Sequence, residues 1–351
     1  MSGSQQGPRL KIFTWHIHSS YLYYLSQGNY DIYIPVSKQL TSGYYGKGNI
    51  FPWGSNVHEI PVEQVKDHNF DCILYQSTKD YLVDQYEILS PAQRKLPRIY
   101  LEHNTPSKSP VSTKHVVNDR RICLVHVTHY NRLMWDNNRT PSTVIEHGVT
   151  MPEDTYTGEL ARGITTINHL PQRGRILGWD IFQQVKNNIP LDLVGVGNDT
   201  AGVGEVLHPQ LPAFRSRYRF YFHPVRHTSL ALAVCEAMMQ GMPVVGLATT
   251  DLVTVIENEK NGFIHTDIRY LEKKMKLLLK DAELAARIGK EAQATAIERF
   301  NIFRFTADWE RLFNAMCSGP VTEDLLNEQL SVIPSPEADL AIKSITMENG
   351  V

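Results

Sequence analysis

The segment that most constrains the fold is an apolar helical run that ends at a glycine and leads into a short apolar strand. Residues 230–240 are helix-tolerant and mostly apolar, which predicts a buried helix. Thr228 and Ser229 are good N-cap residues before it, and Gly241 supplies its stop. Residues 244–247 indicate a short parallel strand with both faces buried. A buried helix that returns into a parallel strand is typical of an α/β fold.

Glu236 does not fit a plain core helix, because it is the only charge in this apolar run. A buried carboxylate is costly unless it is paired or hydrogen-bonded. Glu236 follows Thr228 by eight residues, about 12 Å along a helix that rises ~1.5 Å per residue. The free N–H groups of a helix start suit a phosphate, and a carboxylate farther along suits the hydroxyls of a nucleotide sugar. The alternative is that Glu236 pairs with a nearby cation in the core.

The length and net charge of the chain limit the kinds of function it can have. The 351 residues predict two domains of ordinary size, and a hydrophobic content of 42% is ample for packed cores. Because 35 basic and 37 acidic residues leave a net charge of -2, nothing attracts the whole chain to nucleic acid or an anionic membrane. Basic clusters at 94–98 and 215–219 are interpreted as solvated faces. No nucleic-acid partner is therefore expected.

Cysteine usage and hydropathy point to the cytoplasm. The four cysteines are scattered, form no C-x-x-C pair and lie mostly in apolar runs, as reduced core residues of a cytosolic protein do. No apolar stretch approaches the ~18 residues of a spanning helix. Residues 1–8 are short and polar, unlike a signal peptide. We therefore expect a cytoplasmic protein without a transmembrane segment.

The first half of the chain repeats a pattern of apolar strands that end in histidine. A strand at 10–15, a helix at 21–27 and a strand at 31–36 form a βαβ unit. The loops after strand ends line the ligand crevice of open α/β sheets, so ligand contact is the favoured role of His16 and His18, with helix capping as the alternative. Further strands are predicted at 70–76, 98–106, 122–129 and 142–149.

His103 and His129 lie at two of these later strand ends. Each alone would be interpreted as a satisfied structural histidine, but the repeated pattern favours ligand contact for both. Residues 151–160 contain Pro, Thr and Gly and indicate a linker. A second α/β set follows, and its strand at 191–197 ends in Gly195 and Gly197. Other elements of this set are predicted as strands at 163–167, 218–224 and 261–264, and helices at 176–186, 251–257, 268–280, 281–299 and 302–316.

Several segments, taken in order, resemble the retaining glycosyltransferases of family 4. LDLVGVG at 191–197 is similar to the family's L-x-I-V-G-x-G strand, and CEAMMQGMPVV at 235–245 to its E-A-M-A-x-G-x-P-V-V segment. VIE with NGF at 255–263 resembles E-V-I-x-x-G-x-N-G. EHNTP at 102–106 and VIEHGV at 144–149 match the catalytic-loop and pre-linker segments. The resemblance covers roughly residues 10–316.

The resemblance implies a GT-B fold, in which two Rossmann-like α/β domains face each other across a cleft. Residues 1–155 would form the acceptor-side domain and residues 156–300 the nucleotide-sugar domain. Residues 301–316 would form a helix that crosses back to the first domain. Residues 317–351 hold six acids and one lysine, and we expect them to form an acidic, flexible tail.

The family's motifs also imply roles for individual residues. Glu236 matches the second Glu of the E-x7-E motif, which holds the donor ribose. Ser229 and Leu230 would offer backbone N–H groups to the diphosphate, and Arg173 falls where the family has a diphosphate-gripping Lys. His103 matches a His that contacts the donor sugar near the reacting carbon. The remaining candidates for the donor site are His16, His18, His129, Gly197 and Thr228.

Two positions depart from the family pattern. Thr228 stands where the first Glu of E-x7-E should be, and it makes fewer and weaker hydrogen bonds to sugar hydroxyls than a Glu would. Asn168 stands where the family has an Arg five residues before the diphosphate-binding position, which removes one positive charge from the phosphate site. Arg175 or Arg226 would then have to supply that charge.

The expected function is a retaining glycosyltransferase of the hexosyltransferase type (EC 2.4 class), using a UDP- or GDP-sugar. Arg173 and the dipole of the central helix would stabilise the leaving diphosphate. The sequence has no Asp-x-Asp signature, so no metal and no cofactor are expected. The acceptor, a small molecule, a glycan or a lipid-linked compound, is not identified. The alternatives are a non-catalytic nucleotide-sugar-binding or scaffold protein, which Thr228 and Asn168 favour, and another GT-B enzyme such as a nucleotide-sugar epimerase.

Overall fold

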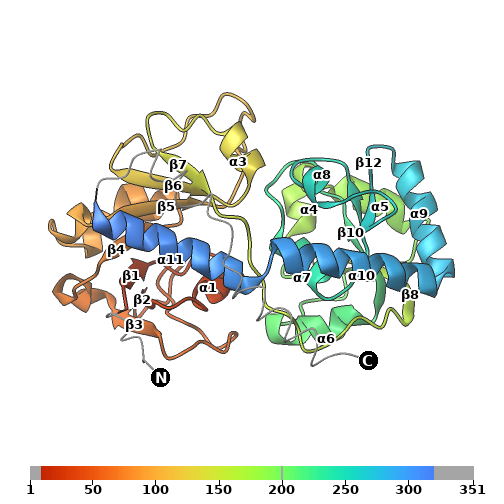
Figure 1. Cartoon of the computed structure of the whole chain (residues 1–351), viewed down its shortest axis with the longest axis horizontal. Helices are drawn as coiled ribbons and strands as arrows, with labels where there is room; N and C mark the ends of the chain where they lie inside the picture. Colours follow the sequence, from red (N-terminus) through yellow and green to blue (C-terminus); the bar gives the residue numbers. More distant parts are fainter. Residues whose placement is uncertain (1–8, 199–200, 320–351) are drawn as a thin grey trace, which may run out of the picture.

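The protein contains two parallel β-sheets, which lie in two lobes side by side (Figure 1). The computed structural model describes residues 9–198 and 201–319. The predicted tail, apart from residues 317–319, lies outside this range. The seven strands of the first sheet have the order β3-β2-β1-β4-β5-β6-β7, and the five strands of the second have the order β12-β11-β10-β8-β9. The α/β prediction is therefore confirmed.

The strands of the first sheet are β1 Lys11–Thr14, β2 Asp31–Val36, β3 Val57–Pro61, β4 Cys72–Tyr75, β5 Arg98–Glu102, β6 Ile122–His126 and β7 Ser142–Val144. Those of the second are β8 Leu160–Thr166, β9 Leu191–Val194, β10 Tyr218–His223, β11 Val244–Leu247 and β12 Gly262–His265. The domain boundary predicted at 155/156 falls between β7 and β8.

The α-helices are α1 Ser19–Leu25, α2 Gln85–Ile88, α3 His129–Met134, α4 Leu170–Arg173, α5 Trp179–Lys186, α6 Leu211–Ser216, α7 Leu232–Met239, α8 Leu252–Val255, α9 Ile268–Lys280, α10 Ala282–Arg299 and α11 Ile302–Ser318. Shorter 3-10 or π segments are η1 Val62–Asp67, η2 Asp80–Asp84, η3 Gln93–Lys95, η4 Gly174–Ile176 and η5 His208–Gln210. None of the described helices is both long and apolar enough to span a bilayer.

Each sheet has a topological switch point at which ligands commonly bind. β1 pairs with β2 on one side and with β4 on the other, so Ile12 lies opposite both Ile32 and Cys72. In the second sheet β8 pairs with β9 and with β10. At such points the connections leave in opposite directions, which opens a crevice beyond the carboxyl ends of the strands.

The last helix returns to the first sheet. In Figure 1 α10 runs along the second lobe and α11 continues along the first. Asn301 caps α11 by accepting a hydrogen bond from the Arg304 N–H. α11 buries an apolar stripe that includes Trp309, whose indole N–H donates to the Tyr21 hydroxyl at 3.2 Å. This contact joins the final helix to α1.

The start of α7 differs from the prediction. The helix was expected to begin at residue 230 with Thr228 or Ser229 as N-cap, but it begins at Leu232 and its N-cap is Ala231, which has no capping side chain. Tertiary contacts explain the difference, because the Ser229 hydroxyl donates to the His103 carbonyl at 2.6 Å instead of capping the helix. The predicted stop is confirmed, since Gly241 has a φ of +85°, a conformation that favours glycine.

Other differences lie mainly at boundaries and in short elements. β8 begins at Leu160, the last residue of the predicted linker, and the short helix α4 was not predicted. β3 and α6 were not predicted, because neither segment has a strong hydrophobic period. The predicted helix at 268–280 is observed with the same bounds as α9.

Candidate functional site

A cavity of about 420 Å³ lies between the carboxyl ends of the two sheets. Ser19 and Phe51 line it from the first sheet's side, and Asn168, Gly195 and Glu236 from the second. Ser19 follows β1, Asn168 lies two residues after the end of β8, and Gly195 follows β9 directly. The cavity therefore occupies the place where the switch points of both sheets face each other. Leu232 and Ala233 also line it, so the amino end of α7 opens into it.

Glu236 is held by three side chains at this cavity. Its Oε1 accepts a hydrogen bond from the Tyr24 hydroxyl at 3.0 Å and lies 3.1 Å from His208 Nε2. Its Oε2 lies 3.2 Å from Nη1 of Arg215, a side chain that is 2% exposed. The alternative of an internal cation partner is therefore observed. The carboxylate nevertheless remains at the cavity wall, since Glu236 is 9% exposed.

The network keeps the Glu236 carboxylate ionised. Burial alone raises the pKa of this group, but the His208 hydrogen bond and the charges of Arg215 and His208 outweigh burial and lower the pKa to about 2. Because α7 begins at Leu232, Glu236 stands four residues into the helix, about 6 Å from its start rather than 12 Å. A fixed negative charge thus lies one turn from the helix's amino end.

A second cavity, of about 390 Å³, lies against the same network. It shares Phe51, His208 and Glu236 with the first cavity and adds Tyr24 and Arg215. The segment 150–153, between the two sheets, also lines it. Glu236 and its partner His208 therefore line both of these cavities.

His103 is held in one orientation by Gln76. The Gln76 amide donates to Thr14 Oγ1 and to the Trp15 carbonyl, both at 2.9 Å, so its Oε1 faces the His103 Nε2 at 3.1 Å as an acceptor. This assigns the proton to Nε2 and leaves Nδ1 as an acceptor. Burial, with smaller effects of His18 and His147, holds the pKa of His103 well below its ordinary value. The imidazole is therefore neutral near pH 7.

His18 lies beside His103, and Arg173 of the second lobe lies near His18. The ring centroids of His18 and His103 are 4.0 Å apart. Burial, and then the charge of Arg173, lower the pKa of His18 to about 4. Arg173 ends α4 and forms no ion pair with a carboxylate in the described residues. His103, His18 and Arg173 thus form a group next to Ser19 of the cavity.

The segment before α7 is fixed from the first sheet's side. Ser229 contacts the His103 carbonyl, and His147 Nε2 lies 2.8 Å from the Leu230 carbonyl oxygen. The backbone N–H groups of Ser229 and Leu230 donate to no backbone carbonyl among residues 9–198 and 201–319. Two unpaired donors therefore remain at the place where the sequence predicted diphosphate contact.

The two arginines expected to replace the missing charge are already paired. Arg226 Nη1 lies 2.6 Å from Asp180 Oδ1, and Arg175 Nη1 lies 2.6 Å from Asp180 Oδ2. One carboxylate is therefore shared by both guanidinium groups. Asn168 is uncharged and cannot replace the missing arginine; its Oδ1 accepts a hydrogen bond from the Val196 N–H at 3.0 Å. Thr228 is half-buried in the segment before α7.

The remaining predicted residues occupy different places. His16 is buried beside the cavity residue Ser19, with Nε2 2.9 Å from the Ser19 hydroxyl, and burial lowers its pKa. Gly197 lies two residues after Gly195, and its φ of +72° favours glycine. His129 is exposed at the start of α3, and no described hydrogen bond joins it to the cavity. Of all the predicted site residues, only Glu236 lines the 420 Å³ cavity itself.

Four functional positions were not predicted. Tyr24, His208 and Arg215 hold Glu236, and Gln76 holds His103. The interpretation of residues 215–219 as a solvated face is wrong for Arg215, because the side chain is buried against Glu236. Tyr24 carried no signal, because 212 residues separate it from Glu236. Among the described residues no three or more His, Cys, Asp or Glu side chains gather as a metal site.

Comparison with known proteins supports a glycosyltransferase. Residues 183–295 match the sequence model of the family described as Glycosyl transferases group 1, and this segment includes β9, α7 and most of α10. This match confirms the predicted resemblance at the level of group 1 for this segment of the chain. A search of curated proteins finds no match.

Solved structures match nearly the whole fold. Sucrose-phosphate synthase from Thermosynechococcus elongatus is 14% identical, with a TM-score of 0.63 over 88% of this chain and 100% of that one. HepE of Anabaena in complex with UDP-glucose is 13% identical, with a TM-score of 0.60 over 88% and 100%. A glycosyltransferase from Rickettsia africae is 12% identical, with a TM-score of 0.59 over 88% and 98%. These similarities confirm the GT-B fold.

Proposed function

We propose that this protein transfers a sugar from a nucleoside-diphosphate sugar to an acceptor hydroxyl, with retention of configuration. The observation that carries the proposal is the 420 Å³ cavity between the sheets, where the amino end of α7 and the ionised Glu236 lie on one wall. The group 1 match over residues 183–295 covers this wall. We propose UDP as the leaving nucleotide, with GDP as the alternative, because the similar HepE structure is a complex with UDP-glucose.

The nucleotide would bind with its ribose at Glu236. A carboxylate offers about four acceptor positions, and Tyr24, His208 and Arg215 occupy three of them. One position therefore remains for a ribose hydroxyl, and displacement of the Tyr24 hydroxyl would free a second. Because Glu236 stays charged, a hydrogen bond from the ribose gains strength from that charge.

The diphosphate would lie away from the carboxylates, towards the segment before α7. Glu205 and Glu236 both line the cavity and repel phosphate oxygens. The unpaired N–H groups of Ser229 and Leu230, the start of α7 and the side chain of Arg173 all favour an anion. They would stabilise the charge that develops as the bond to the sugar breaks.

The neutral His103 would orient the donor sugar. Its Nδ1 is free to accept a hydrogen bond from a sugar hydroxyl, because Gln76 holds the Nε2 proton. In the proposed reaction the bond between the anomeric carbon and the diphosphate oxygen breaks. The acceptor oxygen bonds to the same face of that carbon, and its proton passes to the departing diphosphate. No residue nucleophile and no metal is required.

The test is nucleotide release from a panel of UDP- and GDP-sugars with candidate acceptors. The proposal requires release that depends on an acceptor and falls at least 100-fold in a His103→Ala variant. Anomeric configuration of the product, read by NMR, tests retention. Transfer that persists in excess EDTA supports metal independence, and its loss would contradict that part of the proposal.

A second candidate is a protein that binds a nucleotide sugar without turning it over. Two observations favour it: Thr228 replaces a sugar-binding Glu of the resembled family, and Glu236 already has three partners. UDP or GDP binding without release from any donor would support this second function. Conversion of the donor sugar into its epimer in the absence of an acceptor would instead indicate an epimerase.

A further inference from the structure

A third cavity, of about 590 Å³, lies at the opposite end of the first sheet from the proposed donor site. Arg98 is the first residue of β5, and Arg121 immediately precedes β6. Since the strands are parallel, both residues mark the amino ends of the sheet, whereas the donor cavity lies at the carboxyl ends. We refer to the new cavity as the basic pocket.

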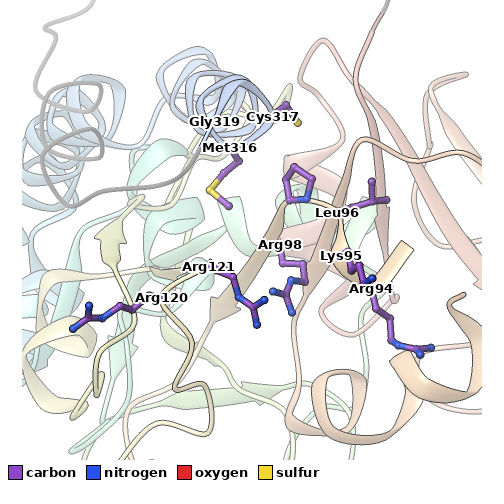
Figure 2. Close-up of a pocket in the computed structure, with 10 residues that line it drawn as sticks. Arg94, Lys95, Leu96, Arg98, Arg120, Arg121, Met316, Cys317 and Gly319 are labelled. Atoms are coloured by element: carbon purple, nitrogen blue, oxygen red, sulfur yellow. The ribbon is translucent and has the colours of Figure 1, made fainter. Parts of the chain in front are cut away.

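Five cationic side chains line the basic pocket, and they come from two separate segments. These residues are Arg94, Lys95, Arg98, Arg120 and Arg121. Figure 2 shows Arg98 and Arg121 near its centre, with Arg120 and Arg94 extending to opposite sides. The sequence alone favoured a solvated face for residues 94–98. Folding brings residues 120–121 to the same cavity as residues 94–98. The cluster therefore differs from an ordinary solvated face, because two separate segments converge on it.

The basic pocket has too few carboxylates to balance its cations. Asp119 is the one carboxylate that pairs with them in the described chain, at 3.4 Å from Arg98 and 3.0 Å from Arg121. The hydrogen bonds from Arg121, assisted by the charge of Arg98, lower the pKa of Asp119 to about 2, so it is ionised. The remaining three cations of the pocket form no ion pair with a described carboxylate.

Arg98 supplies a second, independent observation that favours an anion in the basic pocket. Its side chain is 13% exposed, and its Nε atom is buried without a hydrogen-bond partner in the described residues. Asp119 already accepts hydrogen bonds from the Arg121 N–H, Nε and Nη2 in addition to the long contact from Arg98. A largely buried guanidinium with an incompletely paired fork is costly, and a bound oxyanion would relieve that cost.

One neighbouring feature opposes anion binding, but its negative charge is smaller than the positive charge of the pocket. The carboxyl end of α11 reaches the basic pocket through Met316, Cys317 and Gly319. A helix end carries about half a negative charge, whereas the pocket has five full positive charges and one carboxylate. The same helix end adds Met316, which with Leu96 and Pro97 forms an apolar wall.

We propose that the basic pocket binds an anion that carries two or more phosphate groups. A phosphate monoester carries roughly −1.5 to −2 charges near pH 7, so two such groups match the excess positive charge. Guanidinium forks suit phosphate oxygens, and four of the five cations are arginines. The source is either a soluble polyphosphate compound or a phosphorylated lipid headgroup. The site is separate from the donor cavity and does not depend on the proposed glycosyl transfer.

Calorimetric titration of the full-length protein with inorganic pyrophosphate tests this proposal. The double variant K95A/R120A removes two exposed cations and should weaken pyrophosphate binding at least tenfold. The matched control K273A/K276A removes two exposed charges from α9, on the other lobe, and should leave binding unchanged. R173A should leave pyrophosphate binding at the basic pocket unchanged, because Arg173 belongs to the proposed diphosphate site on the other lobe. UDP binding should be the same in K95A/R120A as in the original chain.

Three results would overturn the proposal. Wild-type affinity in K95A/R120A would show that the pocket cations do not bind the anion. An equal loss in K273A/K276A would indicate diffuse electrostatic attraction, and loss in R173A alone would place the anion in the donor cavity. Flotation with vesicles that contain a phosphorylated anionic lipid, against neutral vesicles, then identifies the source. Binding that requires Lys95 and Arg120 supports a headgroup, and pyrophosphate binding without vesicle binding supports a soluble compound.

Discussion

The Tyr24 hydroxyl donates a hydrogen bond at 3.0 Å to Glu236 Oε1, which joins a helix of the first sheet's lobe to the helix that lines the donor cavity. Tyr24 belongs to α1 and Glu236 to α7. The carboxylate that would hold the ribose is thus also a contact between the two halves of the protein. Nucleotide binding and the relative position of the halves would therefore be coupled.

Removing the Tyr24 hydroxyl should destabilise the protein, because the charged Glu236 then loses one of its hydrogen bonds. We predict that Tyr24→Phe lowers the free energy of unfolding by ~1.5–3 kcal/mol, the range for a hydrogen bond to a charged group. In the Glu236→Gln background the same change should cost less, because the charged acceptor is already gone. Urea denaturation measures both values. Tyr23→Phe is the matched control, since no described hydrogen bond uses the Tyr23 hydroxyl, and an equal loss there would contradict the prediction.

Arg173 should act on the phosphates of the nucleotide and not on its nucleoside. We predict that Arg173→Ala weakens UDP binding about tenfold, as expected for ~1.4 kcal/mol of lost charge interaction, while uridine binding is unchanged. Arg175→Ala should have little effect on either ligand, because Arg175 is paired with Asp180. Calorimetry with both ligands separates these effects. A parallel loss of uridine affinity in Arg173→Ala would show that the change disturbs the cavity rather than a phosphate contact.

His103 should contribute to transfer more than to nucleotide binding. We predict that His103→Ala reduces the transfer rate at least 100-fold and leaves UDP affinity within twofold. Gln76→Leu should reduce the rate by a smaller factor, because it frees the ring that Gln76 orients. His126→Asn controls for the loss of a buried histidine, since His126 instead faces Asn137 at 2.9 Å. Comparable rate losses in His103→Ala and His126→Asn would point to a general packing defect.

Mild acid should destabilise the fold. Burial lowers the pKa of His18, His147 and His223 to about 4, below the ordinary value of 6.5. Between pH 6.5 and about 4 the unfolded chain binds protons that the folded chain excludes. Each such histidine therefore lowers stability by up to ~1.4 kcal/mol per pH unit as the pH falls. Asp80 acts in the opposite direction, because burial raises its pKa to about 6.

Thermal melts at pH 7 and pH 5 check this balance, and we predict a lower melting temperature at pH 5. His223→Gln should reduce the difference between the two melting temperatures, whereas a change at the partly exposed His58 should not. A melting temperature that stays constant or rises on acidification would contradict the assignment of neutral buried histidines.

The helix that carries Glu236 could be predicted from the sequence, but its exact start and the partners of Glu236 could not. Glu236 and the stop at Gly241 could be predicted because charge and chain reversal are local features of residues 230–246. The start of α7 could not, because Ser229 and Leu230 are held by His103 and His147 from distant segments. The same limit applies to Tyr24, Arg215 and Gln76, whose roles arise only when the chain folds.

A crystal structure with bound UDP tests the central claim most directly. We predict that the ribose contacts Glu236 and that the diphosphate lies against the Ser229 and Leu230 N–H groups and Arg173. A nucleotide bound outside the cavity between the sheets, or a Glu236 that keeps only Tyr24, His208 and Arg215 as partners while UDP is bound, would contradict it.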